Sequence, residues 1–330
     1  MTNCERSPEV LPNEYEATFF EDFEIDGKKW SLPVTWKKQG EGFRNFKAKS
    51  DDVWVITQPR SGTTLTQELV WLLANNMDFD NAKKFHLLHR SPELPASLFP
   101  NLWKKCELLR PSQENPKVLE SVPVDTTKNS YEVYVDSLSP RIFKTHLALS
   151  VHKNILDSGC KIVYVARNPK DNLVSKARFA ADGPNPFFKS GLKKYMEDYI
   201  ETDGLFYGPY WPHLKEAWDL REHPNVLFLF YEEMRSDLPG SIRKVAKFLG
   251  KNYSDEEFAK LEEHLNIDNF RKNPMVNELP GYENVPAFIG AGRVGGWREI
   301  MTPEFEAKID RWIEHNIERT GIVFPDLKRC

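Results

Sequence analysis

The chain has 330 residues, of which 40% are hydrophobic and 28% charged, and its formal net charge at pH 7 is −4. This composition is typical of a globular protein, so it excludes a mainly disordered, collagen-like or low-complexity chain. The slightly acidic balance argues against the broad basic surface of a nucleic-acid-binding protein, although it allows a small basic pocket. We therefore expect no nucleic-acid partner.

The cysteines and the apolar segments indicate where the protein works. Cys4, Cys106, Cys160 and Cys330 lie far apart with no CxxC or Cys/His pair, so neither a zinc site nor a disulfide framework is expected. The first ten residues lack the apolar run of a secretory signal, and the run at 226–230 is too short to cross a bilayer. We expect a cytoplasmic protein without a membrane partner or a bound metal.

Regular elements begin after residue 50. Residues 1–50 are polar with scattered aromatic side chains, which predicts an irregular N-terminal segment that packs on the core. VWVIT at 53–57 is apolar on both faces, as a buried parallel strand should be. A loop at 58–64 follows this strand, and leucines at helical spacing then predict a helix over 65–77.

The strand–loop–helix order recurs along the chain. Further strands are expected at 141–147, 161–167 and 225–231, and helices at 209–222, 241–250 and 302–321. Thr302 is the expected N-cap of the last helix, and Gly250 and Gly321 follow the last turns of two helices. Buried strands that alternate with helices predict an α/β fold, with one domain over residues 51–330 and a central parallel sheet flanked by helices.

Parallel sheets of this kind bind ligands at the carboxyl ends of their strands, so the strand exits are the candidate sites. In the first exit, Gly62 permits close approach of an anion, and Arg60 adds a fixed charge suited to phosphate or sulfonate oxygens. Hydroxyl groups come from Ser61, Thr63 and Thr64. The loop predicts a P-loop-like anion site, with a plain strand-to-helix turn as the alternative.

This loop differs from a Walker nucleotide-binding motif. Thr63 follows Gly62 where that motif needs Lys, and Thr57 stands in place of its first Gly. The strand at 161–167 ends in Arg167, and no later strand ends in an Asp suited to Mg²⁺. A metal-dependent kinase or nucleotide triphosphatase is therefore a poor fit, whereas an anion site that works without metal fits better.

The second exit contains Lys144 and His146, which point to the same side of a strand. A cation beside an imidazole keeps it neutral, and a neutral imidazole can act as a general base. Lys144 could also neutralise charge that develops on a group being transferred. A structural or simply solvated histidine is the alternative at this position.

The third exit begins at Arg167, which leaves a buried strand and therefore needs an anionic partner. That partner is either a ligand phosphate, which Ser175 on the following helix could share, or a protein carboxylate such as Asp171. Two weaker signals lie further along the chain. Tyr207, in an aromatic turn at 206–209, could contact a purine, and the four glycines at 290–297 suit a ligand-covering loop or a tight connection.

Taken together, the motifs resemble those of the cytosolic sulfotransferase family. The matching pieces are QPRSGTT, RIFKTHL, YVARNPKDNLVS, FYGPYWPHLKEAW, VLFLFYEEMRSDLPGSI, KNP-x-x-N at 272–277 and the late glycine-rich loop that ends in Gly-Trp. They occur in family order and cover roughly residues 40–320. The run SGTTLTQELVWLL and the use of Arg60 resemble the insect branch, that of retinol dehydratase-like sulfotransferases.

This resemblance implies transfer of a sulfuryl group from 3′-phosphoadenosine 5′-phosphosulfate (PAPS) to a hydroxyl-bearing small molecule. The residues that it assigns by position are Arg60, Ser61, Gly62, Thr63 and Thr64 for the 5′-phosphosulfate, Arg167 and Ser175 for the 3′-phosphate, Tyr207 for the adenine, and His146 as general base, with Lys144 and Arg60 stabilising the transferring group and the leaving phosphate.

The chain departs from the family pattern at several donor-binding positions. Arg60 replaces the usual Lys, Leu65 replaces a stacking Trp, and Leu265 stands where a Thr usually meets the adenine. The usual Arg-Lys-Gly of the late loop reads Gly-Ala-Gly at 290–292, so Gly292 and the neighbouring Arg293 are left to contact the 3′-phosphate. The dimerisation motif is changed at Pro303 and Ala307, which makes the family-type dimer doubtful.

Two functions from different classes follow. The first is an active sulfotransferase for a small, mostly apolar acceptor, which the aromatic N-terminal segment would help to enclose. The second is a catalytically weak or inactive binding protein of the same fold, because the cations of the late loop are missing. A retinol dehydratase-like elimination of sulfate after sulfonation is a side hypothesis to which the sequence ties no residue.

Overall fold

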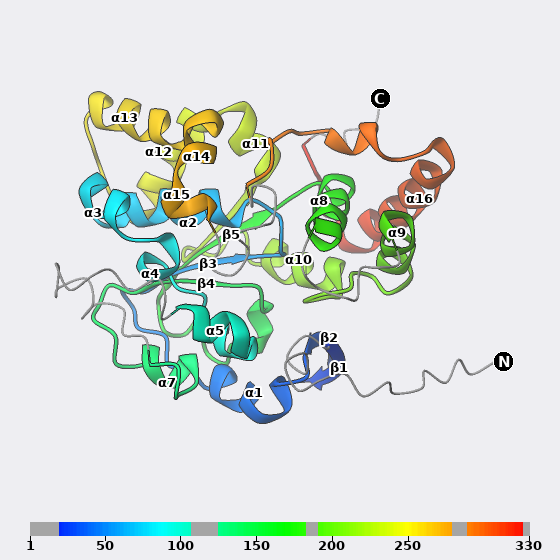
Figure 1. Cartoon of the computed structure of the whole chain (residues 1–330), viewed down its shortest axis with the longest axis horizontal. Helices are drawn as coiled ribbons and strands as arrows, with labels where there is room; N and C mark the ends of the chain where they lie inside the picture. The colour runs from blue at the N-terminus through cyan, green and yellow to red at the C-terminus, as the bar shows by residue number, and fades with distance from the viewer. Residues whose placement is uncertain (1–19, 107–124, 183–190, 279–288, 326–330) are drawn as a thin grey trace.

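The computed structural model describes residues 20–106, 125–182, 191–278 and 289–325 (Figure 1). Their largest sheet contains four parallel strands in the order β4–β3–β5–β6. The strands are β3 (Val53–Thr57), β4 (Ile142–Thr145), β5 (Lys161–Ala166) and β6 (Val226–Phe230). Val53 is in register with Ile142 on one side and Lys161 on the other, so β3 lies between the other two strands that lead into candidate motifs.

Helices cover both faces of this sheet, because both faces of its strands are apolar. Val53 and Val55 pack with the helices α2 (Thr63–Ala74), α12 (Leu238–Leu249) and α13 (Asp255–Leu265). Trp54 and Ile56, which alternate with them, pack with α8 (Pro169–Asp182), α10 (Tyr210–Asp219) and α16 (Pro303–Thr320). Figure 1 shows the first group of helices at the upper left and α8 and α16 at the right. The single-domain α/β fold predicted from the sequence is confirmed.

Shorter elements complete the described chain. They are the helices α3 (Phe79–Lys84), α4 (Leu87–Arg90), α5 (Pro100–Cys106), α7 (Ser130–Tyr134), α9 (Gly191–Glu201), α11 (Tyr231–Ser236), α14 (Ile267–Lys272) and α15 (Pro274–Asn277), and the 3₁₀ turns η2 (Ala96–Leu98), η4 (Leu149–Val151) and η6 (Gly296–Glu299). None of the helices in the described ranges is long and apolar enough to cross a membrane.

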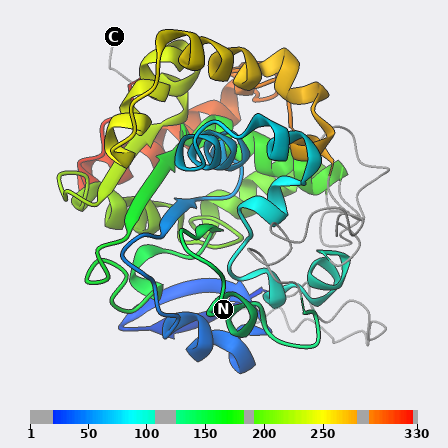
Figure 2. The same ribbon diagram turned by 90° about the vertical axis from the view of Figure 1, so that its left-hand side faces the viewer.

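The N-terminal segment is more regular than the sequence led us to expect. Strands β1 (Phe20–Ile25) and β2 (Lys28–Pro33) form an antiparallel hairpin, and the helix α1 (Trp36–Arg44) follows it, at the bottom of Figure 2. Asp26 and Gly27 both have positive φ, at 49° and 75°, as a two-residue hairpin turn requires. The irregular form expected for residues 1–50 is therefore wrong for residues 20–44.

The predicted element boundaries differ from the observed ones mainly at their ends. The strand at 53–57 is observed as predicted, whereas the helix expected over 65–77 begins two residues earlier and ends at Ala74. The predicted helix ends are confirmed: the Thr302 side chain accepts a hydrogen bond from the backbone N–H of Phe305, and Gly250 and Gly321 adopt left-handed conformations.

Candidate functional site

The order of the sheet brings the three strand exits together. Because β4 and β5 flank β3 and run parallel to it, their carboxyl ends open at the same edge. Thr57 ends β3, Thr145 ends β4 and Ala166 ends β5. The loop after β3 leads into α2 and the loop after β5 into α8, so the N-termini of two helices face this edge.

The loop after β3 depends on a glycine at position 62. Gly62 caps α2 with φ +97°, and a Cβ built on it would lie 2.5 Å from the ring of Tyr231. Ser61 is fully buried and its Oγ accepts a hydrogen bond of 3.0 Å from Asn172. The hydroxyl oxygens of Thr63 and Thr57 are 2.7 Å apart. The loop is thereby held close to the sheet at the N-terminus of α2, where unpaired backbone N–H groups suit an anion.

Arg60 and Arg167 are directed to the same place. Arg60 Nε donates a hydrogen bond of 3.2 Å to Ser175 Oγ, and Arg167 Nη1 donates one of 2.9 Å to the carbonyl of Arg60. Burial, followed by the charge of Arg167, lowers the pKa of Arg60 to about 10. Within the described ranges no carboxylate lies within 4.0 Å of Arg167, and its buried Nε has no hydrogen-bond partner. Two close guanidinium groups of this kind fit an anionic ligand.

The structure decides against Asp171 as the partner of Arg167. Its carboxylate instead accepts hydrogen bonds from the backbone N–H groups of Gly295, at 2.6 Å, and Trp297, at 3.2 Å. Asp171 therefore fastens the late glycine-rich loop to the start of α8. The Arg167 guanidinium instead lies 4.7 Å from the centre of the Tyr231 ring, the ring that packs against Gly62, so Arg167 lies next to the loop after β3.

The late loop approaches the site through its backbone. The carbonyl of Arg293 accepts a hydrogen bond of 3.3 Å from Arg167, whereas the Arg293 guanidinium is exposed and pairs with Glu299 at 2.7 Å. Gly292 has φ +64°, and its carbonyl accepts a hydrogen bond of 3.1 Å from Arg235 Nε. Arg235, which the sequence gave no reason to select, is thus the cation whose side chain meets Gly292.

His146 is held in the tautomer that a base requires. Its Nδ1 lies 2.9 Å from the carbonyl of Thr57, and because a carbonyl only accepts, Nδ1 carries the proton and Nε2 is free to accept one. Lys144 Nζ lies 3.5 Å from that Nε2. Burial and the charge of Lys144 hold the pKa of His146 well below its ordinary value. The imidazole is therefore neutral at pH 7.

Lys144 has a carboxylate partner that the sequence did not reveal. Glu93 is 8% exposed and its Oε2 lies 3.0 Å from Lys144 Nζ. Residue 93 forms an isolated parallel bridge with residue 144, so the backbone carries Glu93 alongside the end of β4. This partner could not be found from the sequence because 51 residues separate the two positions.

Tyr207 lies on the His146 side of the site. Its ring centre is 5.5 Å from that of His146 and 5.7 Å from that of Phe20, and Phe99 lies 6.4 Å away. The Tyr207 hydroxyl is buried and has no hydrogen-bond partner in the part of the chain that the structure describes. Burial raises the pKa of this hydroxyl well above its ordinary value, so it is uncharged. Among the described residues, the ring contacts of Tyr207 are with His146, Phe20 and Phe99 rather than with Arg60 or Arg167.

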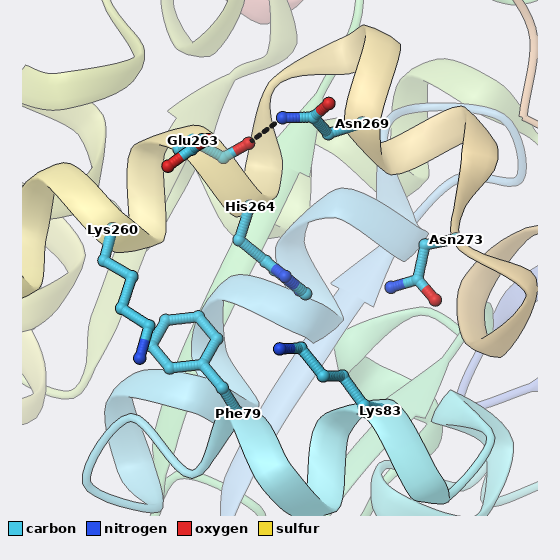
Figure 3. Close-up of a pocket in the computed structure, with 7 residues that line it drawn as sticks. All are labelled: Phe79, Lys83, Lys260, Glu263, His264, Asn269 and Asn273. Carbon is cyan, nitrogen blue, oxygen red and sulfur yellow. Dashed lines mark hydrogen bonds between the residues drawn. The ribbon is translucent and has the colours of Figure 1, made fainter.

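Leu65 and Leu265, the two departures at expected adenine contacts, are both buried, at 7% and 0% exposure, in the cluster under α2 and α13. The described residues also form a groove of about 310 Å³ between α3, α13 and α14 (Figure 3), lined by Phe79, Lys83, Lys260, Glu263, His264, Asn269 and Asn273. None of these residues comes from a strand exit. In the described ranges no group of three or more His, Cys, Asp or Glu side chains could hold a metal ion.

Known proteins are similar to this chain in both sequence and fold. The family model described as "Sulfotransferase domain" matches residues 50–321. Luciferin sulfotransferase of Photinus pyralis is 30% identical over 97% of this chain and 86% of its own length. Sulfotransferase 4A1 of Homo sapiens is 27% identical over 98% of this chain and 99% of its own length.

Solved structures agree with these relatives. Retinol dehydratase in complex with androsterone and the inactive cofactor PAP has a TM-score of 0.79 and 31% identity, covering 97% of this chain and 98% of that one. The same enzyme with retinol and PAP has a TM-score of 0.78 and 32% identity, covering 96% and 97%.

The chain belongs to the sulfotransferase family. The prediction of a PAPS-dependent transferase is thereby confirmed, and the expected insect branch fits the likeness to the Photinus pyralis enzyme. The alternative of an inactive binding protein is not favoured, since the relatives with the higher similarity are named sulfotransferases.

Proposed function

We propose that this protein moves a sulfuryl group from PAPS to the hydroxyl of a small, mostly apolar acceptor, with His146 as the general base. The observation that carries the proposal is the neutral imidazole of His146, whose accepting Nε2 lies beside Lys144 at the same sheet edge as Arg60 and Arg167. A general base typically contributes about 10²–10⁴-fold in rate.

The donor site is assigned to the loop after β3 and the start of α8. Arg60, Ser61, Gly62, Thr63 and Thr64 would hold the 5′-phosphosulfate through the loop backbone and the guanidinium. Arg167 and Ser175 would hold the 3′-phosphate. Two features support this fit, because each suits an anion close to the backbone. Arg167 Nε has no hydrogen-bond partner among the described residues, and Gly62 has a left-handed conformation. The bound donor supplies the sulfuryl group.

The catalytic groups act by accepting a proton and balancing charge. His146 Nε2 would take the acceptor's proton, while the Nδ1–H group keeps its hydrogen bond to the Thr57 carbonyl and holds the ring in place. The ammonium of Lys144 and the guanidinium of Arg60 would stabilise negative charge as it spreads over the transferring group. Glu93 would hold Lys144 next to His146 before the donor arrives.

The acceptor side is assigned to the aromatic wall beside His146. Phe20, Phe99, Phe206 and Tyr207 pack together there, and burial among such rings favours an apolar ligand. Segments 80–120 and 270–290, which lie between the motifs, are further candidates for lining this pocket, and within them residues 107–120 and 279–288 lie outside the described residues. The retinol and androsterone of the solved relatives are apolar molecules with a hydroxyl group, in keeping with this assignment.

We place the catalytic domain at residues 51–330, with the N-terminal hairpin and α1 packed on it, and the protein in the cytoplasm. We also propose that it does without the family-type dimer. Of its changed positions, Pro303 is the first residue of α16, while Thr302 is already engaged as the helix cap.

Replacing His146 tests the function. His146→Ala should lower sulfuryl transfer at least 100-fold, because no base remains. Its affinity for 3′-phosphoadenosine 5′-phosphate (PAP) should stay close to that of the parent. The measurement is transfer from radiolabelled PAPS to a panel of phenols, steroids, retinoids and amines, with calorimetry for PAP. Full turnover in the variant would exclude His146 as the base, and a parent that binds no PAP would exclude the donor site.

A further inference from the structure

Lys176 is a buried lysine on α8 to which no role has yet been given. It follows Ser175, is 4% exposed, and in the described part of the chain no carboxylate lies within 4.0 Å of its Nζ. Burying an ammonium without a counter-charge is costly, so such a group is rare unless something compensates it.

The Lys176 ammonium joins three parts of the site. Its Nζ donates a hydrogen bond of 2.9 Å to Gln58 Oε1 and one of 3.5 Å to the carbonyl of Phe206. Gln58 is fully buried, and its Nε2 donates a hydrogen bond of 2.7 Å to the carbonyl of Tyr207. Tyr207 has φ +56°, a conformation that its neighbours must hold in place. Lys176 therefore connects α8 with the turn that carries Tyr207 and with the start of the loop at 58–64, called the phosphate loop from here on.

The groups that face Lys176 supply no negative charge. Tyr199 on α9 lies with its ring centre 5.2 Å from Nζ, and burial raises the pKa of its hydroxyl well above its ordinary value. His146, after β4, and His213, on α10, are both neutral at pH 7, and the charge of Lys176 contributes to lowering the pKa of each. The neighbouring loop adds the positive charge of Arg60. Among the described residues, then, no counter-charge faces Lys176.

We propose that Lys176 is a positioning residue of the donor site, which holds Gln58 beneath the phosphate loop and whose counter-charge is the bound anionic nucleotide. This inference rests on the proposed function, because it needs PAPS or PAP at that site. It distinguishes Lys176 from Arg60 and Arg167, which would touch the nucleotide directly.

Proton uptake on binding follows from this arrangement. Burial lowers the pKa of Lys176 to about 7, so a large part of the population is uncharged in the free protein near neutral pH. A nearby anion favours the charged ammonium, so nucleotide binding raises its pKa and draws in a proton. PAP affinity should then fall as the pH rises above about 7, with Lys176 responsible.

Calorimetry of PAP binding tests the proposal in a His146→Ala background, which removes one of the two neighbouring histidines. The other, His213, has a pKa of about 4 and stays neutral at pH 8.0. At pH 8.0, binding should take up a substantial fraction of one proton, measured in two buffers that differ in ionisation enthalpy. Adding Lys176→Met should abolish the uptake. The matched control is Lys161→Met, since Lys161 also donates to a backbone carbonyl, that of Phe248, but lies at the opposite end of β5. It should leave the uptake unchanged.

Affinity as a function of pH separates this role from a structural one. Lys176→Met should weaken PAP binding about tenfold or more at pH 6.5. At pH 9.0, where Lys176 is largely uncharged, the difference in PAP affinity between the variant and the parent should be smaller. An equal loss of PAP affinity at both pH values, or no proton uptake by the His146→Ala protein, would overturn the role of Lys176 and leave the proposed function standing. The uptake needs no lysine variant, so it decides the matter even if Lys176→Met does not fold. Absence of PAP binding by the parent would instead overturn the proposed function.

Discussion

The tautomer and the pKa of His146 are set by burial and by the groups next to its ring. The sequence places His146 two positions after Lys144, which predicts that they share one side of a strand. The structure adds the Thr57 carbonyl, which fixes the proton on Nδ1, and Glu93, which pairs with Lys144. Burial, and then the charge of Lys144, hold the pKa of His146 well below its ordinary value.

The pH dependence of activity should therefore respond to Lys144. In Lys144→Met the loss of a positive charge favours the imidazolium, so the pKa of His146 rises and the acid limb of kcat/KM moves to higher pH. The measurement is kcat/KM for sulfuryl transfer between pH 4.5 and 8. Lys153→Met, in which an exposed lysine near Glu41 is changed, serves as control and should keep the parent's limb. An unmoved acid limb in Lys144→Met would exclude electrostatic coupling between the two residues.

At the scale of elements, the phosphate loop is a junction between β3, α2 and α11. Gly62 turns the chain from strand to helix in a left-handed conformation, and Tyr231 of α11 occupies the space where a side chain would otherwise point. The same Tyr231 ring lies under the Arg167 guanidinium. The shape of the anion site thus depends on an element that follows the loop by more than 160 residues.

Substituting this glycine should affect binding as well as stability. Gly62→Ala forces a Cβ to within 2.5 Å of the Tyr231 ring, so the loop must shift and PAP affinity should fall by at least about tenfold. Gly250→Ala is the matched control, because Gly250 has φ +71° with no atom within 4 Å of an added Cβ. It should cost about 1–2 kcal/mol of unfolding free energy through backbone strain, with PAP affinity unchanged. Calorimetry measures the PAP affinity of the two variants, and urea unfolding measures their stability. Equal PAP affinities would contradict the expected clash between a Cβ at position 62 and the Tyr231 ring.

At the scale of the whole molecule, the core behind the site contains buried histidines that are neutral at pH 7. His213 is 1% exposed and connects two parts of the core: its Nε2 donates to the carbonyl of His146, and its Nδ1 lies 2.7 Å from the hydroxyl of Tyr164. Burial lowers the pKa of His213 and of His152 to about 4. In the folded protein each ring therefore takes up a proton only near pH 4, well below the pH at which an exposed histidine does.

Stability should consequently fall in mild acid. Between about pH 6.5 and 4 the unfolded chain protonates its histidines, whereas folded His146, His152 and His213 stay neutral, so the unfolding free energy decreases as the pH falls. Asp203 acts in the opposite sense, because burial raises its pKa to about 7. The net excess of histidines predicts a loss of roughly 1.4 kcal/mol per pH unit for each excess proton. Urea unfolding at pH 7.0 and 5.0 measures this, and equal free energies would refute it.

Much of the fold was readable because the strands carry strong local signals. VWVIT is apolar on both faces and lies at the centre of the sheet, and the caps at Thr302 and Gly321 end α16 where expected. The hairpin at 20–33 was missed even though its Asp26-Gly27 pair is a recognised turn signal, because the flanking residues are largely polar. Local patterns predict elements well where burial is continuous.

The candidate site divides in the same way. Arg60, His146 and Arg167 follow buried strands, so their convergence at one sheet edge could be expected from the chain alone. Asp171 could not be assigned, because its hydrogen bonds to the late loop span more than 120 residues. The side-chain direction of Arg293, the partner of Lys144 and the burial of Lys176 were likewise beyond local reasoning.

The amino-acid order alone determined the α/β architecture, the position of the loop after β3 and the residues that carry charge to the strand ends, since each depends on neighbours a few positions away. Only the tertiary structure decided which charges are neutralised and which await a ligand. The reason is physical: hydrogen bonding, ion pairing and burial act through space, and the partners of Arg167, Lys144 and Lys176 come from segments far apart in the chain.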